Sequence, residues 1–120
     1  MANPFVHVEL MTKDLPKAKE FYTKLFDWKL KELPEVDYTL IEVGQGTGGG
    51  MMKIPMPDMP SHWMAYVLVE DLAASTAKAK ALGATMVKDV TEIDVGKISV
   101  FIDPTGAALA MFQPKPGMMP

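Results

Sequence analysis

A histidine and a glutamate near the start of the chain could carry acid–base chemistry. They lie in the segment from Phe5 to Met11, whose β-branched content and two-residue alternation predict a strand. His7 and Glu9 then share one face of that strand, because successive side chains point to opposite faces. An imidazole changes charge near neutral pH, and a neighbouring carboxylate can give or accept a proton. His7 and Glu9 are therefore the candidate catalytic residues.

Each of these candidates has a plainer alternative. A histidine in a pocket wall that is bonded to a neighbour would be structural, and a strand carboxylate such as Glu9 commonly faces solvent. If Glu9 is buried, its partner must be Lys, His, Tyr or backbone, since the chain has no arginine. The second histidine, His62, precedes Trp63 in a proline-rich stretch, where a surface or hinge position is expected.

A helix is predicted directly after the first strand. Asp14 is expected to cap a helical stretch that ends at Phe26, and Pro16 is tolerated in its first turn. Apolar side chains keep helical spacing along this stretch and form one stripe that is expected to face the core. The stripe consists of Leu15, Ala18, Phe21, Tyr22, Leu25 and Phe26.

The plan of strand and helix is repeated later in the chain. A strand is predicted over 63–69, and a helix follows Asp71 and ends before Gly83. Asp14 and Asp71 are separated by 57 residues, and three further strands follow each helix. An internal repeat of this length indicates two similar units. The predicted fold class is α+β, with two tandem βαβββ modules forming a cupped mixed β-sheet with helices on the outside.

The expected boundaries place one domain over residues 1–120. The first module spans 4–55 and the second 63–114, joined by a linker over 56–62 that contains Pro57 and Pro60.

The face that carries His7 and Glu9 continues into the second module in an apolar form. On the strand at 63–69, the equivalent face holds Met64, Tyr66 and Leu68. Two such sheets could cup an apolar pocket with a few polar groups, which is typical of a small-molecule site. Tyr38 and Tyr66 could each add a hydroxyl group, and Tyr66 is favoured because it shares the Met64 face.

Composition excludes several functional classes. The chain has 120 residues, 48% hydrophobic and 22% charged, with 11 Met and no Cys, and all its basic residues are Lys. Disulfides, thiolate metal sites and Cys nucleophiles are therefore excluded. A net charge of −3 gives no electrostatic footprint for nucleic acid. No export signal and no run of 18 apolar residues is present, so a cytoplasmic location without membrane contact is expected.

Two stretches carry a family resemblance that extends over nearly the whole chain. HVELMTKDLPKAKEFYTKLFDWKL and DPTGAALAMFQP resemble the vicinal oxygen chelate superfamily, which has the glyoxalase and bleomycin-resistance fold. GGGMMKIPMPDMPSHWMAYVLVEDL is most similar to the branch of predicted enzymes related to lactoylglutathione lyase. The resemblance implies the paired-module fold. It also implies either homodimers, which we expect, or modules that pair within one chain. The superfamily hosts lyases, epimerases, dioxygenases and drug binders.

The resemblance also implies where a metal would be held. The four ligand positions of metal-dependent glyoxalases fall on His7, Met51, Met64 and Ala110; Met51 follows from aligning Pro55 with Pro114, to within about one residue. Thioether and methyl side chains do not suit Zn²⁺, Ni²⁺, Fe²⁺ or Mn²⁺. No metal and no other cofactor is expected. We instead expect the ligand pocket to be lined by His7, Glu9, Met51, Met64, Tyr66, Ala110 and Phe112.

The stretch from Gly44 to Gly49 matches the pattern G-x-G-x-x-G but is not expected to bind a dinucleotide. That function needs a helix at the end of the loop, and here a strand and several prolines follow. A flexible loop at the rim of the pocket fits the resemblance better.

Three hypotheses for function remain. The preferred one is a metal-free, glyoxalase-like protein that binds a small, largely apolar molecule in a cup between the modules, with or without proton transfer by His7 and Glu9. The second is a metal-dependent lyase or isomerase related to glyoxalase I. The third is an interaction module without a ligand.

Overall fold

The computed structural model describes residues 2–117, which divide into two compact units. The N-terminal unit is His7–Met64, and the rest of the described chain forms the C-terminal unit. The division passes through the first strand of each module, so that Phe5 and Val6 belong to the C-terminal unit.

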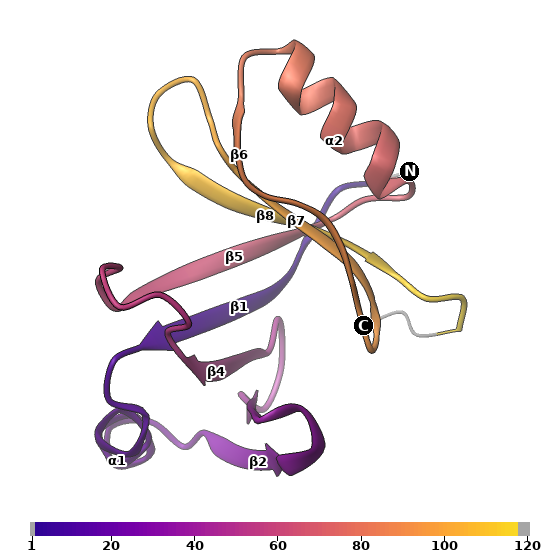
Figure 1. Cartoon of the computed structure of the whole chain (residues 1–120). Coiled ribbons are helices and arrows are strands. Elements are labelled where there is room, and N and C mark those ends of the chain that lie inside the picture. The colour runs from indigo at the N-terminus through magenta and orange to yellow at the C-terminus, as the bar shows by residue number, and fades with distance from the viewer. Residues whose placement is uncertain (1, 118–120) are drawn as a thin grey trace. The chain divides into compact units, whose positions relative to one another are not determined.

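The first module contains five main elements. They are β1 (Phe5–Thr12), α1 (Leu15–Leu25), β2 (Lys29–Leu33), β3 (Tyr38–Glu42) and β4 (Gly49–Lys53), with a short 3-10 turn at Pro34–Val36. The strand order is β2-β3-β4-β1 (Figure 1). β4 pairs with β1 in parallel and with β3 in the antiparallel sense, and β2 and β3 are antiparallel. This part of the sheet is therefore mixed.

The second module repeats this order of elements. It contains β5 (His62–Leu68), α2 (Leu72–Ala81), β6 (Thr85–Ile93), β7 (Gly96–Ile102) and β8 (Ala108–Pro114). The strand order is β5-β8-β7-β6, with β5 and β8 parallel and the other pairs antiparallel. The predicted fold class, α+β with two tandem βαβββ modules and a mixed sheet, is confirmed. The boundaries 4–55, 56–62 and 63–114 stay a prediction.

The two helices begin in the same way. The carboxylate of Asp14 accepts a hydrogen bond from the backbone N–H of Lys17 at 3.1 Å, and Asp71 accepts one from Ala74 at 3.1 Å. These bonds satisfy amides that have no partner within the helix. After α2, Gly83 adopts a φ of +103°, the left-handed conformation that ends helices and that glycine tolerates best.

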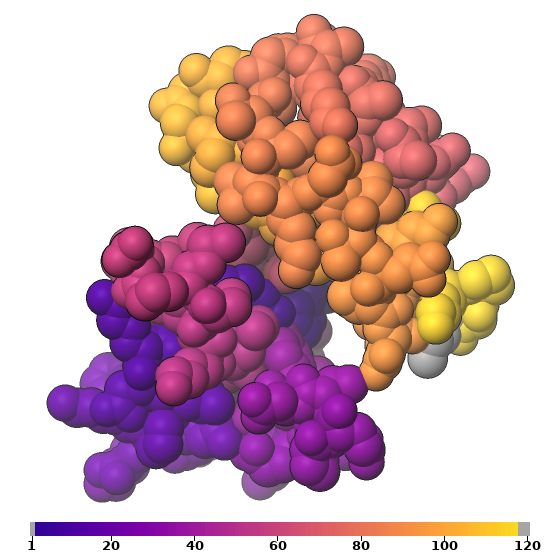
Figure 2. Space-filling view, viewed as in Figure 1, coloured from indigo at the N-terminus to yellow at the C-terminus, as the bar shows by residue number. Residues whose placement is uncertain are grey.

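Each helix packs on an apolar cluster of its own unit. Leu10, Ile41 and Met51 form the buried centre beneath α1, and Leu15, Ala18 and Tyr22 pack against it. Val69, Leu72 and Met111 form the corresponding cluster beneath α2. The space-filling view shows side chains filling the gaps between the ribbons of each unit (Figure 2).

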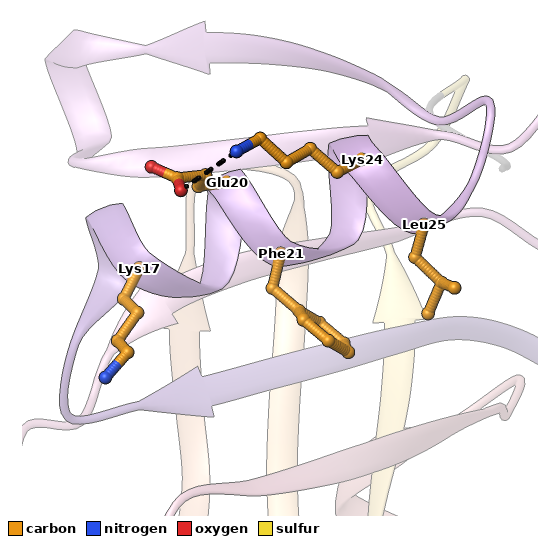
Figure 3. Close-up of a pocket in the computed structure, with 5 residues that line it drawn as sticks. All are labelled: Lys17, Glu20, Phe21, Lys24 and Leu25. Carbon is orange, nitrogen blue, oxygen red and sulfur yellow. Dashed lines mark hydrogen bonds and ion pairs between the residues drawn. The ribbon is translucent and has the colours of Figure 1, made fainter.

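The apolar stripe predicted on α1 is only partly covered. No residue of α1 is buried, and the side chains of Phe21 and Leu25 are 57% and 56% exposed. They project from the same side of the helix as Lys17 (Figure 3), and together with Glu20 and Lys24 they border a surface hollow. The expectation that all six apolar residues face the core was wrong, because the cluster beneath α1 covers a narrower arc than the stripe.

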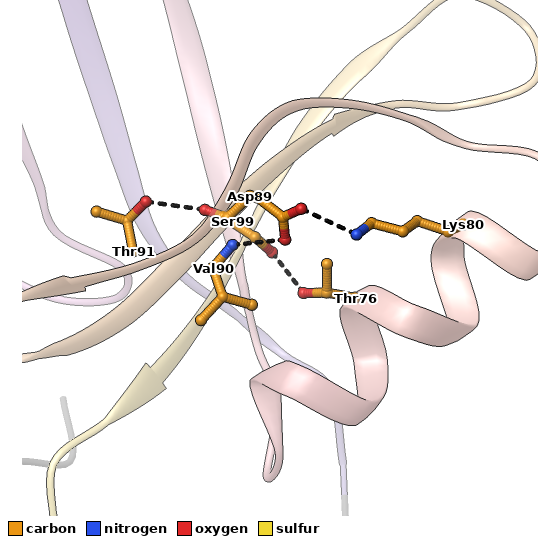
Figure 4. Close-up of polar contacts among 6 residues, drawn as sticks. All are labelled: Thr76, Lys80, Asp89, Val90, Thr91 and Ser99. Carbon is orange, nitrogen blue, oxygen red and sulfur yellow. Dashed lines mark hydrogen bonds and ion pairs between the residues drawn. The ribbon is translucent and has the colours of Figure 1, made fainter.

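Two hydroxyl groups form a buried polar contact beneath α2. The Thr76 and Ser99 hydroxyl oxygens are 3.0 Å apart, and both residues are almost completely buried (Figure 4). A buried hydroxyl left without a partner costs about 1–3 kcal/mol. We therefore expect Thr76→Val to lower the free energy of unfolding in urea by about 1–3 kcal/mol.

The matched control for this prediction is Thr23→Val. The Thr23 hydroxyl donates to the backbone of its own exposed helix, so its loss should change stability by less than about 0.5 kcal/mol. Equal losses in the two variants would contradict the role assigned to the Thr76–Ser99 contact.

Candidate functional site

His7 and Glu9 are joined through a third residue, the tyrosine at the start of β3. The Tyr38 hydroxyl donates a hydrogen bond to Glu9 Oε2 at 2.8 Å and lies 2.8 Å from His7 Nε2. A hydroxyl group has one proton, and the Tyr38 hydroxyl uses it in the hydrogen bond to Glu9. The Nε2–H of His7 must therefore be the donor in the second hydrogen bond. We call these three side chains the polar cluster. It is a directional chain of hydrogen bonds from imidazole to phenol to carboxylate.

The carboxylate of this cluster is largely removed from water. Glu9 is only 6% exposed. Beside it, the rings of His7 and Tyr38 are stacked, with an interplanar angle of 29° and centroids 6.2 Å apart. Burying a carboxylate is costly unless it is hydrogen-bonded. The bond from Tyr38 therefore contributes to the stability of Glu9 at this position.

A glycine makes room for the tyrosine. Gly50 on β4 lies opposite Glu9 in the parallel register, so both occupy the same face. A Cβ atom at position 50 would lie 2.0 Å from the Tyr38 hydroxyl oxygen and 2.2 Å from two ring carbons. The ring thus occupies the space of the missing side chain. The turn before it places Asp37 in the left-handed region, with a φ of +51°, and β3 then starts at Tyr38.

Burial lowers the pKa of the His7 imidazole below its usual 6.5, and the negative charge of Glu9 opposes this effect only in part. In the unfolded chain, His7 takes up a proton below about pH 6.5. In the folded chain, the uptake requires a lower pH. The unfolded state then binds more protons, so the free energy of unfolding falls as pH drops from about 6.5 toward the folded pKa.

The pH dependence can be measured directly. We expect NMR titration of the two histidines to give a pKa below 6.5 for His7, with His62→Gln used to assign the signals. His7→Gln should reduce the loss of stability between pH 7 and pH 5.5 in urea unfolding. A His7 pKa at or above 6.5 would contradict the burial seen here.

Met51 does not lie where the sequence suggested. It is opposite Leu10 in the β1–β4 register and completely buried in the cluster beneath α1. Its counterpart in the second module, Met111, lies in the cluster beneath α2. The expectation that Met51 lines the pocket was therefore wrong: it faces the helix side of the sheet.

The strand register also identifies the residue of β4 that occupies the ligand position predicted for Met51. In the first module Glu9 is opposite Gly50, and in the second Tyr66 is opposite Ala110. Since Glu9 and Tyr66 are equivalent in the repeat, Gly50 is the equivalent of Ala110. Both positions therefore lack a side chain that could coordinate a metal ion.

The remaining candidates are distributed over both units. Met64 is buried and belongs to the N-terminal unit, as do His7 and Glu9. In the C-terminal unit, Tyr66 is buried and opposite Ala110, and Leu68 is opposite the half-buried Phe112. His62 bonds locally, with Nδ1 2.8 Å from the Pro60 carbonyl oxygen.

The sequence did not single out Tyr38 of the polar cluster or Gly50 beneath its ring. It favoured Tyr66 over Tyr38 as the source of a hydroxyl group and gave no role to Gly50. One feature of the sequence could have indicated this contact. A tyrosine begins one strand and a run of glycines begins the next, and in antiparallel neighbours an aromatic ring can lie over a glycine.

The metal set of the glyoxalases does not fit these residues. The four positions now carry an imidazole (His7), no side chain (Gly50), a thioether (Met64) and a methyl group (Ala110). Glu9 adds one carboxylate, whose Oε2 is bonded to Tyr38. Within residues 2–117, no group of three or more His, Cys, Asp or Glu side chains is arranged to hold a metal ion. The donor set falls short of what a divalent ion requires.

The fold and the polar cluster together define an α+β protein of paired βαβββ modules with a histidine and a carboxylate on its first strand. Residues 5–111 match the family model of the Glyoxalase/Bleomycin resistance protein/Dioxygenase superfamily. The chain belongs to this superfamily.

Similar proteins agree with this assignment. The chain is 37% identical over 81 residues to proteins named "Putative glyoxylase CFP32" from Mycobacterium tuberculosis and Mycobacterium bovis. The match covers 67% of this chain and 31% of those relatives, so the chain spans about a third of their length.

Solved structures with the same fold include an enzyme. Methylmalonyl-CoA epimerase from Mycobacterium tuberculosis has a TM-score of 0.69 at 18% identity, covering 93% of this chain and 88% of that one. A superfamily member from Vibrio splendidus 12B01 has a TM-score of 0.63 at 13% identity, covering 95% and 100%. At these identities the likeness concerns the fold alone. No helix in residues 2–117 has the length and apolar character needed to span a membrane.

Proposed function

We propose that this chain binds a small, largely apolar molecule that carries one hydrogen-bonding group, and that the polar cluster receives that group. The observation that carries the proposal is the hydrogen-bonded chain from His7 through Tyr38 to the buried carboxylate of Glu9. Buried ionisable groups of this kind are concentrated at functional sites, because they are costly to keep for stability alone.

The three side chains would have separate roles. The His7 Nε2–H could donate its hydrogen bond to a ligand oxygen in place of the Tyr38 oxygen. Glu9 orients Tyr38 by accepting the hydrogen bond from its hydroxyl group. Met64, which lies in the same unit, would provide an apolar contact. The assignment of Tyr66, Ala110 and Phe112 to the pocket stays a prediction from the sequence. The proposal excludes a glyoxalase-type metal site because Gly50, Met64 and Ala110 are poor donors.

Proton transfer is the second candidate function, supported by the same cluster. A lowered pKa leaves His7 neutral near pH 7, the state in which an imidazole can accept a proton. A metal-dependent lyase or isomerase is disfavoured by the donor set. Homodimer formation and a cytoplasmic location stay predictions from the sequence.

A thermal-shift screen tests the proposal. Small aromatic and aliphatic compounds with a single carbonyl or hydroxyl group are screened, and a saturable rise in Tm is expected for some of them. For those compounds, His7→Ala should weaken binding about three- to tenfold, the range for one hydrogen bond. His62→Ala is the matched control and should leave affinity unchanged. Absence of any stabilising compound, or equal affinity in His7→Ala, would contradict the proposal, and the first result would favour an interaction module.

A further inference from the structure

An apolar pocket lies in the N-terminal unit, away from the polar cluster. It has a volume of about 270 Å³ and is lined by Trp28, Trp63, three aliphatic side chains and the glycine-rich loop at 47–49. One of the aliphatic residues is Val8, which lies between His7 and Glu9 on β1. Since neighbouring strand residues point to opposite faces, the pocket and the polar cluster lie on opposite faces of β1.

Both tryptophans of the chain border this pocket, and their rings are held in place. The indole N–H of Trp63 donates to the Tyr22 hydroxyl at 3.3 Å. The Tyr22 ring lies 5.6 Å from Trp28 and 5.4 Å from Trp63, and the two indoles are 6.2 Å apart at 75°. Aromatic pairs at such distances and angles attract one another. The two indole rings are therefore fixed in position before any ligand binds.

The side chain of Trp63 is fixed by its neighbours but only partly covered. Its exposed fraction is 39%, although it is fixed by Tyr22 and Trp28. Exposing a fixed indole beside a hollow leaves apolar surface in water, and a ligand that covers it would recover that free energy.

The floor and rim of the pocket determine the class of ligand. Val8, Ile41 and Val43 are aliphatic, the loop contributes backbone and the Thr47 side chain, and no lining residue is charged. Gly49 lies so close to the Val8 carbonyl oxygen that a Cβ atom would be 2.1 Å from it. The glycine therefore brings the loop against β1. Such a site suits an uncharged, apolar ring, because no lining residue carries a positive charge for a phosphate or carboxylate.

We propose that the pocket bordered by Trp28 and Trp63 is a second binding site, which takes an uncharged aromatic ring against the exposed part of Trp63. This site is independent of the polar cluster and of the function proposed for it. The glycine-rich loop forms its rim.

The two tryptophans give a direct readout. The protein is labelled with 5-fluorotryptophan, which gives one ¹⁹F signal for each tryptophan, and is titrated with 2-naphthol or with decahydro-2-naphthol. The two probes share a carbon skeleton, but only the first is flat and aromatic. We expect 2-naphthol to shift both signals saturably and to bind about three- to tenfold more tightly than the saturated alcohol.

Variants locate the site. Trp63→Leu should weaken 2-naphthol binding about three- to tenfold, followed by the remaining Trp28 signal and by calorimetry. Phe5→Leu removes another exposed aromatic side chain that does not line the pocket and should leave affinity unchanged. His7→Ala should also have no effect, and this separates failure here from failure of the polar cluster.

Three results would overturn the proposal. The first is that neither probe gives a saturable shift, and the second is that both bind equally. The third is that the ¹⁹F signals move with protein concentration rather than with probe, which would mean that a second copy of the chain covers the pocket.

Discussion

Replacing Met51 by alanine is expected to lower the free energy of unfolding by about 2–5 kcal/mol, the range for deleting a large core side chain. Met51 is fully buried between Leu10 and Ile41 beneath α1. Its removal would leave a cavity that the paired strands β1 and β4 cannot close by moving. Urea unfolding of the variant, followed by circular dichroism, gives the value.

The matched control is Met56→Ala, since Met56 is exposed and its loss should cost less than about 0.5 kcal/mol. If Met51 instead lined a ligand pocket, Met51→Ala would change ligand affinity and leave stability nearly unchanged. That result would contradict the strand register described here.

Introducing a methyl group at Gly50 should have the next largest effect. The new Cβ atom would overlap the Tyr38 ring, so Gly50→Ala is expected to displace the ring and to lower the free energy of unfolding by about 1–3 kcal/mol. Displacing Tyr38 also removes the hydrogen bond to the buried Glu9 carboxylate. The His7 NMR signals should change at the same time.

A double-mutant cycle isolates this effect. In a Tyr38→Ala background the ring is absent, so the further change Gly50→Ala should cost less than about 0.5 kcal/mol. A cost equal to that in the wild-type background would mean that Gly50 is needed for another reason, and the account of Tyr38 lying over Gly50 would be wrong.

The faces of β1 could be predicted from the sequence because strand alternation has a period of two. His7 and Glu9 share a face with each other, and Leu10 lies on the opposite face with the helix. The helix caps at Asp14 and Asp71 could be predicted as well, since a cap depends on residues within one turn. These features are local, and local chemistry determines them.

Met51 was misplaced because the repeat is not uniform. Equivalent residues are 57 apart at Glu9 and Tyr66 but 60 apart at Gly50 and Ala110, whereas aligning the prolines implied 59. A slip of one residue moves a side chain to the other face of a strand. The lengths of the turns between the strands determine this offset, and no pattern of residues within a strand predicts it.

Tyr38 and the exposed part of α1 were missed for a related reason. The contact of Tyr38 with Glu9 joins residues 29 positions apart and depends on the space above Gly50. On α1, helical spacing identified the apolar side of the helix but not how far the cluster beneath it extends. The exposure of Phe21 and Leu25 was therefore not predicted. Both facts belong to packing between elements.

The central claim is our proposal that His7, which the family resemblance puts at a metal-ligand position, serves a hydrogen-bonded cluster with Tyr38 and Glu9 and not a metal site. Isothermal titration of the chelator-treated protein with Zn²⁺, Ni²⁺ and Mn²⁺, combined with elemental analysis of untreated protein, tests it most directly. The account predicts no tight binding that depends on His7, and far less than one metal ion per chain. One tightly bound divalent ion per chain, lost in His7→Ala, would contradict it.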